Sequence, residues 1–293
     1  SSGLGAGTKT VTITAQPASA YPRLELDGSG GNISLASGIS FSTSGANTGG
    51  GVMWNLAGDN TVNGTISLTS GNGSTKILSN GGSLTLAGNI AIGGGSARTL
   101  YLAGTSTGAN TVSGVISDGA YTLSLGKQET GTWTLSNANT YSGATTISAG
   151  KLVLANTLAA QNSTVTVSVS DGLAFDTATA FTLGGLAGAN NFALTNTTGA
   201  AVVLSIGNND AGTTYDGVMS GIGSLTKAGS GKTVLSGANT YSGRTTVSGG
   251  TLECTAGGTV AASTNLTISS GAQFDIHNIG DVVGNTCPVY LDG

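Results

Sequence analysis

One phrase occurs twice in this chain, at residues 135–148 and again at residues 235–248. The copies read LSNANTYSGATTIS and LSGANTYSGRTTVS, and their tyrosines, Tyr141 and Tyr241, lie 100 positions apart. Near-identical phrases need equivalent places in a fold, and a fold that stacks repeated units along an axis supplies such places. The repeat therefore predicts a stacked architecture, and no enzyme motif in the sequence competes with it.

The centre of each copy is Ala-Asn-Thr-Tyr-Ser-Gly. We predict a structural role for its residues, which are Asn139, Thr140, Tyr141 and Gly143 in the first copy and Asn239, Thr240, Tyr241 and Gly243 in the second. An asparagine at a corner can hydrogen-bond the backbone of its own turn. A tyrosine can pack flat on neighbouring coils with its hydroxyl in water. A ligand-facing role for these residues is the alternative.

Related phrases surround the two copies. The best-kept repeats extend over residues 114–154 and 217–254. A second phrase with the spacing Gly-x-x-Phe occurs at residues 169–176 and 268–275, and a looser version occurs at residues 35–41. The chain therefore reads as one pattern that becomes less regular toward the N-terminus, and we expect a single domain over residues 1–293.

The composition favours short strands joined by tight turns. Only 8% of the residues are charged and 51 of the 293 are glycine. Threonine and the β-branched aliphatic residues suit a pleated, half-buried surface, whereas glycine, asparagine and serine suit turns. Disorder would go with low hydrophobicity and high net charge, but 38% of this chain is hydrophobic and its net charge is only −4.

Short alternating segments separated by glycine, asparagine or serine mark the expected strands. They lie at residues 10–14, 33–35, 65–68, 83–86, 99–102, 164–169 and 266–268. Such strands would also suit a β-sandwich, but a sandwich uses each strand in a different place, so it does not explain the repeats. We therefore predict an all-β fold, a parallel right-handed β-helix (β-solenoid) of roughly a dozen coils, each about 20–25 residues long.

The charge distribution and hydropathy exclude two classes of partner. The nine basic residues are scattered singly, which argues against nucleic-acid binding. The longest apolar run, residues 200–204, is far shorter than the roughly 20 residues of a membrane-spanning helix. We therefore expect no nucleic acid and no membrane span.

Cys254 and Cys287 are the two cysteines of the chain. Because the chain otherwise looks extracytoplasmic, a disulfide between them is the favoured interpretation, and two free thiols are the alternative. Two cysteines and one histidine, His277, form a poor ligand set for a metal, so we predict no metal site and no cofactor.

The sequence offers little for catalysis. His277 lies near Asp275 and Asp281, but no nucleophile elbow accompanies a Ser-His-Asp arrangement. Polysaccharide-cleaving β-helices need paired carboxylates, whereas the acidic residues here, such as Asp59 and Asp118, are mostly single and lie in predicted turns. We predict no enzymatic activity and no catalytic residue.

The stretch from Gly217 to Leu252 resembles the autotransporter-associated β-strand repeat, also called the passenger-associated transport repeat. The matching residues are Gly217, Gly221, Gly223, Leu225, Lys227, Gly229, Gly231, Leu235, Ser236, Ala238, Asn239, Thr240, Tyr241, Gly243, Thr245, Val247, Gly250 and Leu252. The first copy resembles the pattern from Trp133 onward. It departs upstream, where Gly-Lys-Gln-Glu-Thr-Gly at residues 126–131 replaces Lys-x-Gly-x-Gly.

This resemblance implies a β-helical passenger that is secreted or displayed on the cell surface of a Gram-negative-type bacterium. In that family the repeat is associated with passenger export and has no known catalytic role. We expect a released passenger, a fragment of a larger protein, or a protein that uses the repeat in another way.

Two functional hypotheses follow. The first is a structural or adhesive surface protein whose partners are copies of itself or another cell-surface component. In this hypothesis, a strand at residues 8–14 pairs with the next subunit in a head-to-tail filament. The alternative is a carbohydrate-binding or polysaccharide-cleaving β-helix.

Overall fold

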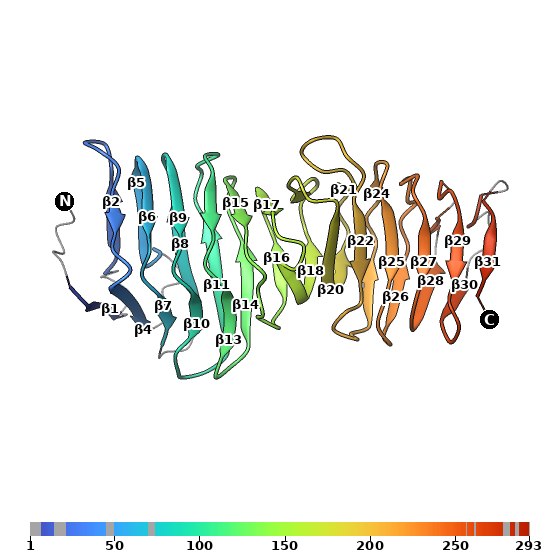
Figure 1. The fold of residues 1–293 in the computed structure, drawn as a ribbon, viewed down its shortest axis with the longest axis horizontal. Helices are drawn as coiled ribbons and strands as arrows, with labels where there is room; N and C mark the ends of the chain where they lie inside the picture. The colour runs from blue at the N-terminus through green and yellow to red at the C-terminus, as the bar shows by residue number, and fades with distance from the viewer. Residues whose placement is uncertain are drawn as a thin grey trace. The chain divides into compact units, whose positions relative to one another are not determined.

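A computed structural model describes residues 7–14, 22–44, 50–69, 74–255, 257–260, 262–277, 282–284 and 287–292. The fold is a parallel β-solenoid of about 10 turns. The described residues form strands and turns without a helix, so none of their elements is a helix long and apolar enough to cross a membrane (Figure 1). The chain divides into two compact units, residues 1–152 and 153–293.

In the first unit, successive turns place their strands in three parallel columns (Figure 1). The first column contains β1 (Lys9–Thr14), β4 (Ile39–Ser44), β7 (Ile66–Leu68), β10 (Ile90–Ile92) and β13 (Ile116–Gly119). The second contains β2 (Leu24–Asp27), β5 (Met53–Ala57), β8 (Thr75–Ser79), β11 (Arg98–Ala103), β14 (Leu123–Lys127) and β16 (Thr145–Ile147). The third contains β3 (Ser34–Leu35), β6 (Asp59–Val62), β9 (Ser83–Leu86), β12 (Asn110–Val112) and β15 (Thr132–Leu135). β17 (Lys151–Leu154) spans the boundary between the units.

The register of the first column shows how a turn builds the core of this unit. The residues in line are Phe41, Ile66, Ile90 and Ile116, and all of them are buried. One turn here takes roughly 25 residues, which lies within the range of stacked repeats. Because strand side chains alternate between two faces, this register places an apolar row inside and a hydroxyl-rich row outside. Each buried aliphatic side chain contributes roughly 1.5–3 kcal/mol to the stability of the stack.

The second unit contains two long columns and one short one (Figure 1). One long column contains β18 (Ala160–Val167), β20 (Ala180–Gly188), β23 (Thr213–Tyr215), β26 (Lys232–Leu235), β28 (Thr251–Thr255) and β30 (Gln273–His277). The other begins at β20 and continues with β22 (Val203–Ile206), β25 (Ser224–Lys227), β27 (Thr245–Val247), β29 (Leu266–Ile268) and β31 (Val289–Leu291). β21 (Phe192–Ala193) pairs with β24 (Met219–Ser220), and β19 (Leu173–Phe175) precedes β20.

Turns in the second unit are shorter. The residues in line along its second long column are Leu204, Leu225, Thr245, Leu266 and Val289. One turn of this column takes roughly 21 residues, close to the lower end of the range for stacked repeats. The shorter turns leave less chain for a third strand, which agrees with the short third column.

Aromatic side chains fill part of the core of the second unit. The ring centroids of Phe175 and Phe181 are 4.8 Å apart, those of Phe175 and Phe192 are 6.2 Å apart, and Phe192 meets Tyr215 edge-on at 5.7 Å. Tilted and edge-on pairs at these distances are favourable arrangements for aromatic rings. The buried hydroxyl of Tyr215 donates a hydrogen bond to the carbonyl oxygen of Asn190 at 2.7 Å.

The structure confirms the predicted class, an all-β parallel β-solenoid. The seven predicted strands correspond to β1, β3, β7, β9, β11, β18 and β29. The structure supports about 10 turns, and the predicted count of roughly a dozen coils is not confirmed. The right-handed sense and the single domain over residues 1–293 stay predictions.

Candidate functional site

The asparagine of each repeat links neighbouring turns. Asn139 Oδ1 accepts a hydrogen bond from the backbone N–H of Ile116 at 2.9 Å, and Asn239 Oδ1 accepts one from Met219 at 2.8 Å. Asn239 Nδ2 also donates to the carbonyl oxygens of Gly237 and Thr259 at 3.0 and 3.1 Å. The predicted bond to its own turn is therefore present, but the same side chain also holds the turns before and after it.

The repeat tyrosines are buried at their hydroxyl ends as well as their rings. Tyr141 and Tyr241 are each 1% exposed. Their hydroxyls hydrogen-bond Thr145 Oγ1 at 2.7 Å and Thr245 Oγ1 at 2.6 Å. The expectation of a hydroxyl in water is therefore wrong, because the whole side chain is buried and its hydroxyl bonds a threonine of the same repeat. Burial raises the pKa of the Tyr241 phenol, against the opposing effect of its bond to Thr245.

The remaining repeat residues explain why the corner has this sequence. Gly143 and Gly243 approach the preceding turn so closely that a Cβ would lie 2.4 Å from Leu123 O in the first copy and 2.2 Å from Gly223 O in the second. Thr140 and Thr240 are exposed and anchor the corner through their backbone N–H groups. The predicted motif residues are thus accounted for by packing or backbone bonding, and the structural role stays the prediction that the geometry favours.

A buried lysine is the repeat residue whose role sequence reasoning missed. Lys127 Nζ donates to the carbonyl oxygens of Gln128 and Glu129 at 2.7 Å each and of Ala149 at 3.1 Å. Lys227 Nζ forms the corresponding three bonds, to the carbonyls of residues 228, 229 and 249, at 2.6, 3.1 and 3.1 Å. Both lysines are 0% exposed. The Lys-x-Gly-x-Gly pattern could have signalled this lysine, because its glycines bring turn carbonyls close together.

Burial also changes the acid–base behaviour of these lysines. It lowers the pKa of the Lys127 ammonium to about 8, against the attraction of Glu129. It lowers the pKa of Lys227 as well, against the attraction of Asp210. Each ammonium is held by three backbone carbonyls, so these lysines serve the scaffold and are unavailable to a ligand.

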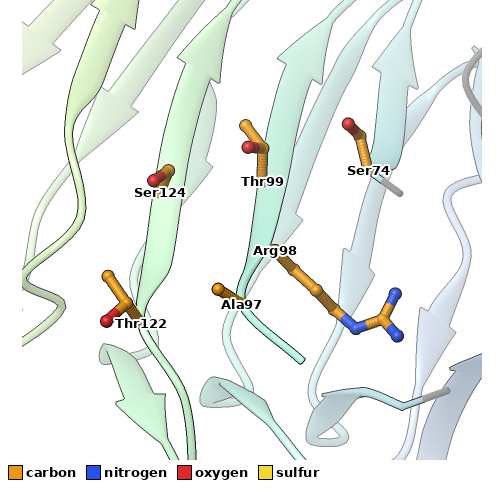
Figure 2. Close-up of a pocket in the computed structure, with 6 residues that line it drawn as sticks. All are labelled: Ser74, Ala97, Arg98, Thr99, Thr122 and Ser124. Atoms are coloured by element: carbon orange, nitrogen blue, oxygen red, sulfur yellow. The ribbon is translucent and has the colours of Figure 1, made fainter. Parts of the chain in front are cut away.

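Among the described residues, hydroxyl groups gather in grooves on the outer faces of the strands. In the first unit, Ser74 just before β8, Thr99 on β11 and Ser124 on β14 line a surface groove of about 280 Å³ (Figure 2). Figure 2 shows these hydroxyls in a row on neighbouring strands, with the Arg98 side chain pointing away from them. Burial lowers the pKa of Arg98. The row presents uncharged hydrogen-bonding groups along the column.

An adjoining groove of about 260 Å³ shares Thr99 and Ser124 with the first. Tyr101 lines it, and its ring lies against Gly126, where a Cβ would be 2.3 Å from ring atoms. Thr146 on β16 continues the same outer face. A half-buried aromatic ring among hydroxyls provides both an apolar surface and hydrogen-bonding groups.

The second unit carries a similar hydroxyl row. Ser205, Thr226, Thr246 and Thr267 are in register on β22, β25, β27 and β29. Arg244 and Thr246 are among the residues that line a groove of about 460 Å³ beside this row. Both units therefore repeat hydroxyl groups at the spacing of their turns.

The two cysteines are present as thiols. Cys254 is buried on β28, and Cys287 is half-buried. Both lie close enough to raise the pKa of Tyr241 further. Burial, and then the charge of Glu253, raise the pKa of the Cys254 thiol to about 12. The disulfide stays a prediction.

The acidic residues considered for catalysis have structural partners where they are described. Asp118 accepts hydrogen bonds from the backbone of Leu123 at 2.8 Å and from the Ser142 hydroxyl at 2.7 Å. Asp59 accepts two bonds from Ser83, at 3.0 and 2.8 Å. Asp281 lies outside the described residues. The absence of enzymatic activity stays a prediction.

Comparisons with known proteins agree with this geometry. The family model described as the passenger-associated-transport-repeat matches residues 125–154 and 225–253. Over 166 residues the chain is 33% identical to the adhesin BmaC autotransporter of Brucella suis biovar 1, a match that covers 51% of this chain and 5% of that protein. The chain thus spans only a small part of that relative's length. No solved structure matches.

Both matched segments begin in the strand that carries a buried lysine, β14 or β25, and end in the second strand after the Asn-Thr-Tyr corner, β17 or β28. The segments that the family model matches are therefore the ones whose backbone contacts are duplicated in the two units. The chain carries two copies of the passenger-associated-transport repeat within a β-solenoid, and it is homologous to an autotransporter adhesin over about half its length.

Proposed function

We propose that this chain is part of an exported, surface-displayed or secreted β-solenoid that has a structural and adhesive role, without enzymatic activity, in a Gram-negative-type bacterium. The observation that carries the proposal is that inward-facing and outward-facing polar groups have different roles. Their polar side chains hold the backbone from inside, whereas the outer faces repeat hydroxyl groups in register. The similarity to an autotransporter adhesin supports it.

The adhesive surface is the outer face of the first unit, formed by Ser74, Thr99, Ser124 and Tyr101. Its two grooves share residues, so the face is continuous over several turns. A regular row of uncharged hydroxyls makes many weak hydrogen bonds to an extended partner. Such contacts add up when many copies are displayed together. The partner is another cell-surface component.

Beads coated with the purified full chain test this role on a monolayer of epithelial cells. We expect them to be retained more than beads coated with serum albumin. Beads coated with the variant Ser74→Glu/Thr99→Glu/Ser124→Glu should be retained at least tenfold less, because the variant places carboxylates in the hydroxyl row. The matched control, Ser205→Glu/Thr226→Glu/Thr246→Glu in the second unit, should retain it. Equal retention of wild-type and albumin beads would overturn the adhesive role.

Self-assembly into a head-to-tail filament is the finer part of the proposal. β1 pairs with β4, and among the described residues its other edge has no strand partner. β31 pairs with β29, and its residues Val289, Tyr290 and Leu291 are 51%, 52% and 76% exposed. Open strand edges and exposed apolar side chains favour pairing with another chain.

Electron microscopy at increasing protein concentration tests the filament. We expect particles that lengthen by whole multiples of the single chain. The variant Thr10→Pro/Thr12→Pro should stop the growth because proline removes backbone donors from β1. Single particles at every concentration would contradict self-assembly while leaving the adhesive role to the bead experiment.

A further inference from the structure

The second unit brings three potential metal ligands together on the outer face of two adjacent strands. Glu253 on β28 is directly opposite Asp275 on β30 in the parallel register. His277 follows two residues after Asp275, so it lies on the same face of β30. Each side chain offers one ligand atom, and the three atoms lie within 4.8 Å of one another. Sequence reasoning had paired His277 with Asp275 and missed Glu253, because the cross-strand register brings Glu253 to them.

The side chains around this group leave ligand atoms available. Lys232 Nζ contacts Glu253 Oε2 at 2.7 Å, and Gln273 Nε2 donates to Asp275 Oδ1 at 2.6 Å. Each carboxylate therefore keeps a second oxygen outside those bonds. Two carboxylates beside one ammonium leave an excess of one negative charge next to the imidazole of His277. Glu253 is 8% exposed, and low exposure to water strengthens the attraction between its carboxylate and a cation.

The chemistry of the ligands decides which cation fits. An imidazole nitrogen with two carboxylate oxygens suits Zn²⁺ and related divalent transition metals, whereas Ca²⁺ prefers six to eight oxygen ligands. Metal–ligand bonds of about 2.0–2.2 Å place two ligands of one ion no more than roughly 4.4 Å apart. The three ligand atoms therefore need only a small side-chain rotation to close around an ion.

We propose that Glu253, Asp275 and His277 bind a divalent transition-metal ion of the Zn²⁺ type. The ion joins β28 to β30, and water completes its coordination. This site departs from the expectation of no metal site, which considered only the cysteines as partners of the histidine. It also gives Lys232 a role, because its ammonium competes with the metal for Glu253. Lys232 is a 54% exposed side chain and can move into solvent when the ion binds.

Isothermal titration of the metal-free full chain with Zn²⁺ tests the site. We expect one saturable site, with Ca²⁺ bound at least a hundredfold more weakly. His277→Ala and Glu253→Gln should each weaken Zn²⁺ binding at least tenfold. Lys232→Met should strengthen it severalfold, because it removes the competing ammonium, and a merely structural role for the lysine predicts no such gain. The matched control Glu25→Gln, an acidic residue of the first unit that also pairs with a basic residue, should leave binding unchanged.

Hydrogen exchange and circular dichroism provide two further tests of the metal site. Zn²⁺ should slow hydrogen exchange of the β28 and β30 amides, and circular dichroism should show that each variant remains folded. Cys287→Ser should not change the affinity. Loss of Zn²⁺ binding in Cys287→Ser together with its retention in His277→Ala would place the metal on a thiol and overturn the proposal. Absence of saturable binding to the wild-type chain would overturn it as well.

Discussion

The two copies of the repeat, one in each unit, keep the same polar contacts while their apolar surroundings differ. Lys127 and Lys227 each bind three backbone carbonyls, and both repeat tyrosines bind a threonine four residues later. In contrast, the buried residue at the equivalent core position is Trp133 in the first copy and Thr233 in the second. The difference shows that the repeat preserves the contacts that hold the backbone, whereas the packing around them can change.

Most turns of the first unit contain more residues than those of the second, but the turns within the two repeat copies have the same length. Along the second column, the step from Leu102 to its partner Lys127 is as long as the other turns of the first unit. The next step, from Lys127 to Ile147, is as short as the turns of the second unit. It has the same length as the step from Lys227 to Val247 in the second copy. The repeat thus imposes its own turn length, because its lysine and tyrosine contacts span a set number of residues.

The largest expected effect comes from the apolar difference between the copies. Trp133 is fully buried, and its indole N–H donates to Ala103 O at 2.9 Å. Trp133→Ala should lower the free energy of unfolding by about 3–5 kcal/mol, because it leaves a cavity and an unpaired carbonyl. Thr233→Ala should cost much less. Urea unfolding measures both, and equal losses would show that packing is the same in the two copies.

A disulfide would stabilise the second unit alone. A disulfide between Cys254 and Cys287 should raise the free energy of unfolding by about 3–4 kcal/mol relative to the reduced chain. The oxidised protein should give no free thiol with Ellman's reagent in denaturant and should melt at a higher temperature than Cys287→Ser. Two titratable thiols after mild oxidation would show that the cysteines do not pair.

The lysine contacts should contribute similarly in both copies. Lys127→Met and Lys227→Met each leave three turn carbonyls without their donor. Because an unsatisfied buried polar group costs about 1–3 kcal/mol, and the loss of a buried charge offsets part of this, we expect a net loss of about 2–3 kcal/mol for each variant. Urea unfolding of the two variants compares them. A loss in only one copy would contradict the equivalence of the repeats.

Removing a repeat hydroxyl should have a smaller effect. Tyr141→Phe and Tyr241→Phe each delete one buried hydrogen bond, so we expect each to lower the free energy of unfolding by about 1 kcal/mol. In the second copy, Thr245 Oγ1 keeps another partner when the tyrosine hydroxyl is removed, because it also bonds the Ser263 hydroxyl at 2.9 Å. Thermal unfolding of the variants checks the values, with Tyr121→Phe, an exposed tyrosine, as the control that should not change.

The smallest expected effect concerns the departure of the first copy from the repeat pattern. Glu129 has φ of 58°, close to the 68° of Gly229 at the equivalent position. Left-handed backbone costs a non-glycine residue roughly 1 kcal/mol, and Glu129 recovers part of it by accepting a bond from Gly104 N at 3.0 Å. Glu129→Gly should therefore change stability by less than about 1 kcal/mol. A loss of more than about 2 kcal/mol by urea unfolding would exceed the backbone contribution and show that the carboxylate is essential.

Much of the fold follows from local sequence pattern. The alternation of apolar and hydroxyl residues marks strands such as β9 and β29, and glycine or asparagine between them marks the turns. The duplicated phrase then requires stacking. The buried orientation of Tyr141 and Tyr241 could not be read in the same way, because a tyrosine beside a corner fits the inside or the outside of a turn equally well.

The sequence by itself determined the class of fold, the repeat and its resemblance to exported passengers, because these depend on residue type and spacing along the chain. The tertiary structure decided which side chains meet. Only the stacking of turns brings Lys227 to Gly249, Ser74 to the row with Thr99, and Glu253 to Asp275. Each of these pairs is about one turn apart in sequence, and the two residues of a pair meet only when whole turns stack on one another, which no local segment encodes.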